Sequence, residues 1–176
     1  KKSPRKKTPP KLSLKQDLLF EKITEFYAKP NNINILLNIV NSNTKISLRI
    51  IDWFVTNYSK KNFVVIRKKA KSTSKTLKKD NMVDLNVFLD YKALLKGYSK
   101  KLFDPFCRRE RVSFKYNEKD SLTTTVGQLH FFKWAIENGI IKYIEENLKD
   151  IEADMNSNIK KSNNDKKSLK NNSNNT

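Results

Sequence analysis

The stretch ERVSFKYNEKDSLTTTVGQLHFFKWAIEN, residues 110–138, carries the clearest structural signals in this sequence. Apolar and polar side chains alternate along its first part, ERVSFKY, which is typical of a half-exposed β-strand. The segment LTTTV is β-branched, and the five residues NEKDS between the two segments suit a β-hairpin. Thr125 and Gln128 match a capping box, so a helix is predicted to start directly after the hairpin.

The predicted helix over 126–138 is apolar on two sides. Leu129, Phe132 and Ile136 share one face, whereas Phe131 and Trp134 point away from it. This pattern predicts a helix sandwiched between a sheet and other helices. A surface on which Phe131 and Trp134 stack against bases, or contact a partner protein, is the alternative.

Further helices are predicted on both sides of this unit. Ser13 with Gln16 is expected to cap the first helix, Pro30 to end it, and Asn32 to cap the second. The expected elements are, in chain order, helices over 14–28, 33–40 and 45–61, a strand over 63–66, a helix over 86–102, the hairpin, and helices over 126–138 and 140–155. The fold class is therefore α+β and mostly helical: five or six helices, a small antiparallel sheet formed by a β-hairpin at about 112–126 and the strand 63–66, and flexible basic tails.

Composition indicates an intracellular protein with a polyanionic partner. The 176 residues include 37 Lys and Arg against 18 Asp and Glu, so the net charge is +19. No apolar run approaches the roughly 18 residues that span a bilayer, and no secretory signal is recognised, so we expect no membrane contact. Cys107 and His130 are the only residues of their kind, which excludes an internal disulfide and a Cys/His zinc site. We expect neither a metal nor a cofactor.

The positive charge is concentrated in three stretches that contain few or no aromatic side chains. Residues 1–16 hold seven basic groups and residues 60–79 hold nine, in both cases without an acidic residue. The last stretch, 157–176, adds five lysines against one aspartate. We therefore expect a disordered basic arm over 1–12, a single folded domain over 13–156 with a basic loop at 67–82, and a disordered Lys/Asn/Ser tail over 157–176.

Two basic clusters within the folded part are predicted to bind phosphate. Arginine binds phosphate bidentately, and LFDPFCRRERVSFKY contains three of the six arginines. Lysines repeat every four residues along the predicted helix that leads into this segment. This lysine stripe and the arginine cluster are therefore expected to form one continuous basic surface. The predicted nucleic-acid-binding residues are Arg108, Arg109, Arg111 and Lys115, the stripe Lys92, Lys96 and Lys100, and Arg67, Lys68 and Lys69 of the basic loop. The alternatives are an arginine paired with a carboxylate, and a lysine stripe that is only the solvated face of an amphipathic helix.

The sequence offers little for catalysis. Cys107 and His130 could pair as nucleophile and base, but no motif orients them. There is no Gly-rich phosphate loop, paired-carboxylate motif or EF-hand pattern. We expect a protein without enzymatic activity and without catalytic residues.

Three segments resemble an uncharacterised protein family of giant nucleocytoplasmic large DNA viruses of protists, similar to mimiviruses and phycodnaviruses. They are YKALLKGYSKKLFDPFCRRERVSFKY (91–116), LTTTVGQLHFFKWAIENGIIKYI (122–144) and ISLRIIDWFVTNYSKKN (46–62). The resemblance implies a viral, non-enzymatic context and carries no catalytic residues over.

The leading hypothesis is a largely sequence-independent nucleic-acid-binding protein that packages or organises viral DNA, with DNA favoured over RNA. The chief alternative is a virion or viral-factory scaffold whose basic arms bind acidic protein partners. An RNA-binding factor that uses its aromatic side chains is a third hypothesis. The expected location is the virion or the viral factory in the host cytoplasm; PRKK and RKKAK make the host nucleus an alternative.

Overall fold

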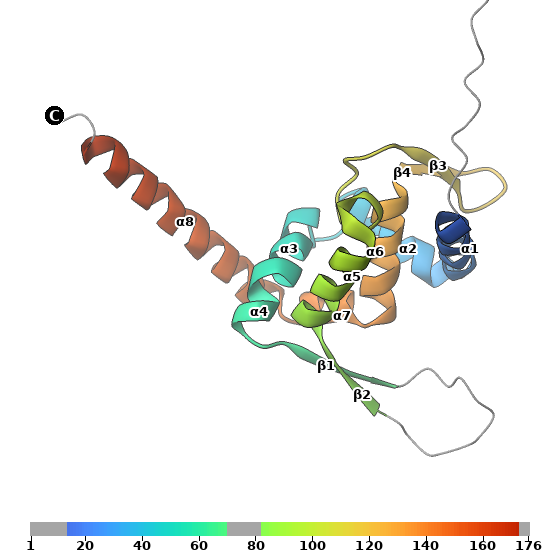
Figure 1. The fold of residues 1–176 in the computed structure, drawn as a ribbon, viewed down its shortest axis with the longest axis horizontal. Coiled ribbons are helices and arrows are strands. Elements are labelled where there is room, and N and C mark those ends of the chain that lie inside the picture. Colours follow the sequence, from blue (N-terminus) through green and yellow to red (C-terminus); the bar gives the residue numbers. More distant parts are fainter. Residues whose placement is uncertain (1–13, 70–81, 173–176) are drawn as a thin grey trace, which may run out of the picture.

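A central helix, other helices around it and two peripheral β-hairpins make up the described part of the chain (Figure 1). The computed structural model describes the backbone of residues 14–69 and 82–172, and the side chains of residues 16–69 and 82–162. The elements are, in chain order, α1 (Leu14–Tyr27), α2 (Pro30–Val40), α3 (Leu48–Trp53), the π-helical turn η1 (Phe54–Tyr58), α4 (Ser59–Lys61), β1 (Val65–Lys69), β2 (Met82–Asn86), α5 (Val87–Leu102), β3 (Val112–Lys115), β4 (Ser121–Thr124), α6 (Val126–Glu137), α7 (Ile140–Glu146) and α8 (Leu148–Asn172). The predicted α+β class, mostly helical with antiparallel strands, is confirmed.

Helix α6 is the most buried element and contacts α1, α2, α5 and α7. It begins as predicted, because the Thr125 hydroxyl accepts a hydrogen bond from the Gln128 N–H at 3.0 Å. Phe131 and Trp134 are both buried, and each packs against Tyr91 and Phe103. The predicted burial of α6 on both sides is therefore confirmed, although the elements packed against it are helices and not a sheet. The alternative of an exposed base-stacking surface on α6 is wrong.

The predicted start of the second helix is wrong by three residues. Helix α2 begins at Pro30, whose fixed φ suits the first helical position and whose missing N–H is not needed there. Asn32 is inside the helix, and its side chain donates a hydrogen bond to the Phe26 carbonyl at 2.9 Å instead of capping α2.

Strand β1 has a partner that the sequence analysis did not predict. It pairs antiparallel with β2, with Ile66 opposite Leu85 and Arg67 opposite Asp84, and forms a hairpin separate from β3–β4. The structure therefore has two two-stranded sheets in place of one small sheet. Both ends of the expected basic loop, residues 67–69 and 82, belong to strands, because the β-branched and aliphatic residues beside them pair across the hairpin. The rest of the expected loop, residues 70–81, lies outside the described part.

The C-terminal region is more helical than predicted. Gly139 adopts a left-handed conformation (φ 72°) and separates α6 from α7, and a second interruption at Asn147 separates α7 from α8. If α3, η1 and α4 are counted as one continuous run, the described residues form seven helices. Helix α8 packs on α3 through Ile151 and Met155 and then projects away from the other helices (Figure 1). Its backbone stays helical through Asn172, whereas we expected a disordered tail from residue 157; the expected arm over 1–12 lies outside the described residues.

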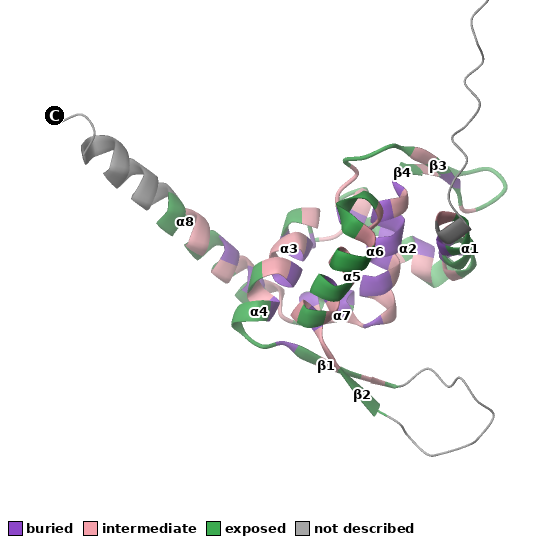
Figure 2. Cartoon of the chain, in the orientation of Figure 1, coloured by how far each residue is buried: buried purple, intermediate pink, exposed green. Residues whose placement is uncertain are grey.

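Helix α5 forms the outer layer on one side of the core. It packs on α6 and on η1 and α4, and its buried face contains Val87 and Tyr91 with Leu94, Leu95, Tyr98 and Leu102 partly buried, as predicted. Much of its remaining surface is exposed (Figure 2). Because α5 runs from the end of β2 to the loop before β3, it connects the two hairpins.

Candidate nucleic-acid interface

The exposed face of α5 is the clearest cationic surface in the described part of the chain. Lys92 and Lys96 lie one turn apart on the regular part of the helix. Lys100 and Lys101 follow Ser99, whose non-helical backbone (φ 57°, ψ 171°) kinks α5, and all four lysines are exposed. None of the four has an ion pair with another described residue. We name this set the α5 lysine face.

The only acidic residue of α5 does not neutralise this face. Asp90 is half-buried and accepts a hydrogen bond from Trp134 Nε1 at 2.6 Å, so its carboxylate is used toward the core. Ala93 and Gly97 are exposed among the lysines, and a Cβ added to Gly97 would contact nothing within 4 Å. Small side chains between cations allow a rod-shaped polyanion to approach the helix closely.

Arg108 lies at the C-terminal end of α5 but is used within its own loop. Its Nε and Nη2 atoms each donate a hydrogen bond of 3.0 Å to Asp104, whose side chain is only 4% exposed. Asp104 also accepts a hydrogen bond from the Phe106 N–H at 3.1 Å, and the guanidinium lies over the Phe106 ring. Hydrogen bonding to Asp104 raises the pKa of Arg108 further. The guanidinium thus stabilises the loop. For Arg108, this agrees with the alternative given in the sequence analysis, an arginine paired with a carboxylate.

A second carboxylate reduces the positive potential at this end of α5. Burial raises the pKa of Asp52, on α3, while the charges of Lys100 and Arg108 lower it and that of Asp104 raises it. Lys100 and Arg108 both act on Asp52, but α5 is kinked at Ser99, so the continuous basic surface expected from the sequence stays a prediction. Two acidic and two basic groups meet there, so the positive face of α5 is strongest toward Lys92 and Lys96.

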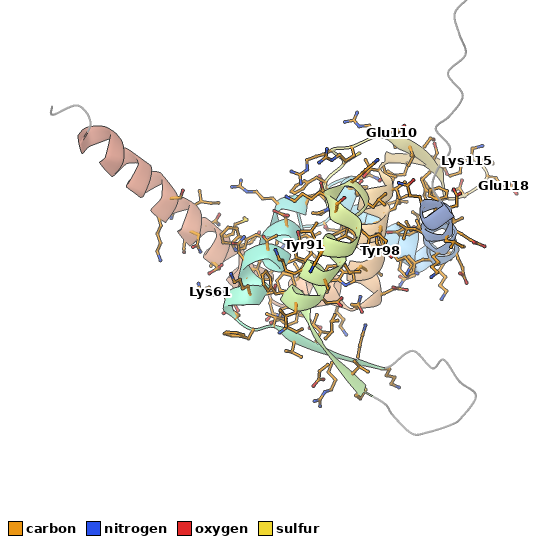
Figure 3. All side chains as sticks on the ribbon, in the orientation of Figure 1. Lys61, Tyr91, Tyr98, Glu110, Lys115 and Glu118 are labelled. Carbon is orange, nitrogen blue, oxygen red and sulfur yellow. The ribbon has the colours of Figure 1, made fainter. Side chains whose placement is uncertain are left out.

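The other predicted arginines and Lys115 surround the second hairpin. Arg109 and Arg111 are exposed in the loop before β3 and have no ion pair with a described residue. Figure 3 places Lys115 on the β3–β4 hairpin, together with Glu110 and Glu118. This cluster is of mixed charge and is weaker than the α5 lysine face.

The three predicted residues of β1 lie on the other hairpin. Arg67 forms a bidentate pair with Asp84 on β2, with distances of 2.8 and 3.2 Å, and this hydrogen bonding lowers the pKa of Asp84. Lys68 donates a hydrogen bond to Asn138, and Lys69 is exposed. Figure 1 shows that β1–β2 and β3–β4 project from opposite ends of the helical body, so the predicted residues of the two hairpins do not form one compact patch.

His130 is placed in a structural role. Its Nδ1–H donates a hydrogen bond of 2.7 Å to the Leu102 carbonyl, and its ring packs edge-on against Tyr98 and Phe103. Burial lowers the pKa of the imidazole, which keeps the ring neutral. Within the ranges that the structure describes, no three His, Cys, Asp or Glu side chains form a group that could hold a metal ion. None of the described helices combines the length and the apolar character needed to cross a bilayer.

One feature of the surface was missed by the sequence analysis. A groove of about 420 Å³ lies where α4 meets α8, with the ring of Phe63 at its edge. The sequence analysis placed Phe63 in a strand. The signal that could have identified it as part of a surface site was its position close to Lys60 and Lys61.

Comparisons with known proteins agree with the resemblance noted in the sequence. The chain is 40% identical over 158 residues to an uncharacterised protein of Acanthamoeba polyphaga mimivirus; the match covers 86% of this chain and 58% of that protein. The chain thus spans little more than half the length of this viral relative. No solved structure matches the chain significantly. The predicted similarity to an uncharacterised giant-virus family is confirmed. Residues 4–176 match a family model described as a family of unknown function, DUF7197, and the chain belongs to this family.

Proposed function

We propose that this chain is a non-enzymatic protein that binds nucleic acid, DNA in preference to RNA, largely without reading the base sequence. The observation that carries the proposal is the α5 lysine face, whose four exposed cations have no carboxylate partner among the described residues. Lysines one helical turn apart are spaced by about 6 Å, which is comparable to the spacing of phosphates along a strand. Contacts of this kind position a nucleic acid without reading its bases.

The dimensions of α5 suit a segment of duplex. Its regular part before the kink at Ser99, residues 87–98, extends over roughly 18 Å at about 1.5 Å per residue. At about 3.4 Å per base pair, this length corresponds to roughly five base pairs. Arg109, Arg111 and Lys69 lie beyond the two ends of the helix and would contact phosphates further along.

The sequence outside the described residues supports the same function. The first 16 residues carry seven basic groups and no acidic residue, and further lysines follow Lys69. Such segments attract a polyanion over long distances and raise its association rate. Together with a relative in a giant virus, these charges favour a role in packaging or organising viral DNA, in the virion or the viral factory.

The proposal is tested by removing the charge of the α5 lysine face. We expect Lys92→Gln, Lys96→Gln and Lys100→Gln, combined in the full chain, to weaken binding to a short mixed-sequence duplex by about 100-fold at ~0.1 M salt, because up to three phosphate contacts are lost. Fluorescence anisotropy measures the affinity, and circular dichroism checks the fold. The matched control replaces three exposed lysines with glutamine at positions away from α5. They are Lys22 on α1, Lys29 between α1 and α2, and Lys119 in the β3–β4 turn.

The control separates specific placement from overall charge. If both triple variants bind the duplex equally well, the α5 lysine face is not the interface and the tails alone attract DNA. If the unaltered chain does not bind duplex at ~50 mM salt, where electrostatic binding is strong, but captures acidic polypeptides, the scaffold hypothesis replaces the proposal.

A further inference from the structure

Phe63 is an exposed aromatic residue held in an unfavourable backbone conformation. Its side chain is 80% exposed, and its φ is +49°, in the left-handed region that bulky residues avoid. The backbone on both sides is fixed, because the Asn62 N–H donates to the Tyr58 carbonyl and the Val64 N–H to the Ser59 carbonyl, both at 3.0 Å. The ring is therefore held in solvent by its neighbours, and such strain is characteristic of functional positions.

The groove beside Phe63 has a second aromatic wall. Trp53 lines it, and the indole is fixed by a hydrogen bond of 2.9 Å from Nε1 to Asp154 Oδ2 on α8. The π-helical turn η1 lies directly between Trp53 and the residues of α4, and π-helical turns are frequent at functional sites. The groove, about 420 Å³, is lined mainly by apolar surface and is open to solvent. Its size falls within the range of small-ligand sites.

Cations and amides surround these aromatic walls. Lys60 and Lys61 line the groove, and Lys61 pairs with the other oxygen of Asp154 at 2.5 Å, so this carboxylate is already neutralised. Asn57 and Asn158 use their amide N–H groups within the protein, toward Thr56 and Asp154. Their carbonyl oxygens, which the structure pairs with no described donor, can accept hydrogen bonds from a ligand.

The groove is continuous with the α5 lysine face. The Lys60 ammonium lies 5.5 Å from the centre of the Phe88 ring, which belongs to the first turn of α5. Figure 3 places Lys61 at the end of α4, on the side from which α8 projects. A strand that leaves the groove past Lys60 would therefore reach Lys92 and the rest of the α5 lysine face.

We propose that this groove binds an unpaired nucleobase of single-stranded DNA. Phe63 and Trp53 contact the base plane, the two asparagine oxygens accept from the N–H groups on the edge of the base (in thymine, the ring N3–H), and Lys60 binds the adjacent phosphate. Aromatic side chains beside cations are the usual combination for single-stranded nucleic acid, because every base has a flat face to stack. The inference deepens the proposed function and rests on it. It adds that the protein holds single-stranded DNA more tightly than its lysine face alone would.

The test compares single-stranded and duplex DNA with the full chain. We expect Phe63→Ala to weaken binding to a short oligothymidine by about tenfold, the effect of losing one stacked base, and to leave duplex affinity unchanged. Phe63→Tyr keeps the flat ring and should bind oligothymidine as tightly as the unaltered chain. Leu18→Ala, which removes another exposed apolar side chain from the distant α1, is the matched control and should change neither affinity.

Each result has a distinct meaning. If Phe63→Ala binds oligothymidine as tightly as the unaltered chain, or loses affinity for single-stranded and duplex DNA equally, the groove does not bind an unpaired base. If the unaltered chain binds neither DNA, the proposed function itself fails. If it binds duplex through the α5 lysine face and Phe63→Ala has no effect, only the inference fails. Because Phe63 is exposed, its replacement should not unfold the protein, and thermal melting verifies this.

Discussion

The pair between Arg108 and Asp104 should contribute measurably to stability, because it links the end of α5 to the loop that leads into β3. Replacing Arg108 with Gln would leave the Asp104 carboxylate, 4% exposed, with the Phe106 N–H as its remaining hydrogen-bond donor among the described residues. Leaving a buried charge without its partner costs about 3–5 kcal/mol. Since the Arg108 side chain is 53% exposed, water reduces this, and we expect a loss of about 2 kcal/mol.

Urea denaturation of a double-mutant cycle measures this contribution. In a protein of this size, about 2 kcal/mol lowers the melting temperature by roughly 4–8 °C. Asp104→Asn should cost less, since its side-chain oxygen still accepts from Phe106. Adding Arg108→Gln to Asp104→Asn should then cost little more, which gives a coupling of about 1 kcal/mol or above. The reasoning is refuted if Arg108→Gln alone changes the free energy of unfolding by less than ~0.5 kcal/mol, a value typical of an exposed arginine.

Three further substitutions test the packing and the strain. Gly127→Ala should lose about 1–3 kcal/mol in urea denaturation, because the new Cβ would lie 3.1 Å from the Lys101 carbonyl oxygen; an unchanged midpoint would contradict the close approach. Burial lowers the pKa of His130, so the folded state binds a proton less readily than the unfolded chain. The free energy of unfolding should therefore be highest above about pH 6.5, the usual pKa of histidine, and decrease as the pH falls below it, by at most ~1.4 kcal/mol per pH unit. His130→Asn, whose amide can still donate to the Leu102 carbonyl, should flatten this dependence; an equal slope in both proteins would exclude His130 as its source. Phe63→Gly should melt at a higher temperature than Phe63→Ala, since only glycine adopts a positive φ without strain; the reverse order would argue against strain.

The sequence predicted the elements whose signals are local. The N-cap at Thr125, the alternation in β3 and the buried pattern of α6 each depend on residues a few positions apart, and all three are confirmed. The second half of the predicted capping box is not formed, because the Gln128 side chain forms hydrogen bonds with Thr124 and Pro105 instead. Strand β2 was missed because its pairing with β1 is non-local and its residues adjoin a strongly charged segment. The continuation of α8 beyond residue 157 was missed because composition favoured disorder there.

The candidate site was predictable only in part. The four-residue repeat placed Lys92 and Lys96 together on the exposed face of α5, but no local pattern predicted the kink at Ser99 that precedes Lys100. The role of Arg108 depends on the burial of Asp104, which no local pattern reveals. The groove beside Phe63 requires α8 to lie against α4 and a positive φ at Phe63, and both arise from tertiary packing.

The salt dependence of duplex binding tests the central claim most directly, because it counts phosphate contacts. Each contact contributes about −0.9 to the slope of log K against log salt concentration. We predict that combining Lys92→Gln, Lys96→Gln and Lys100→Gln makes the slope shallower by about 2–3, whereas the matched exchange of Lys22, Lys29 and Lys119 leaves it unchanged. Equal slopes for the unaltered chain and both variants would contradict a nucleic-acid interface on α5.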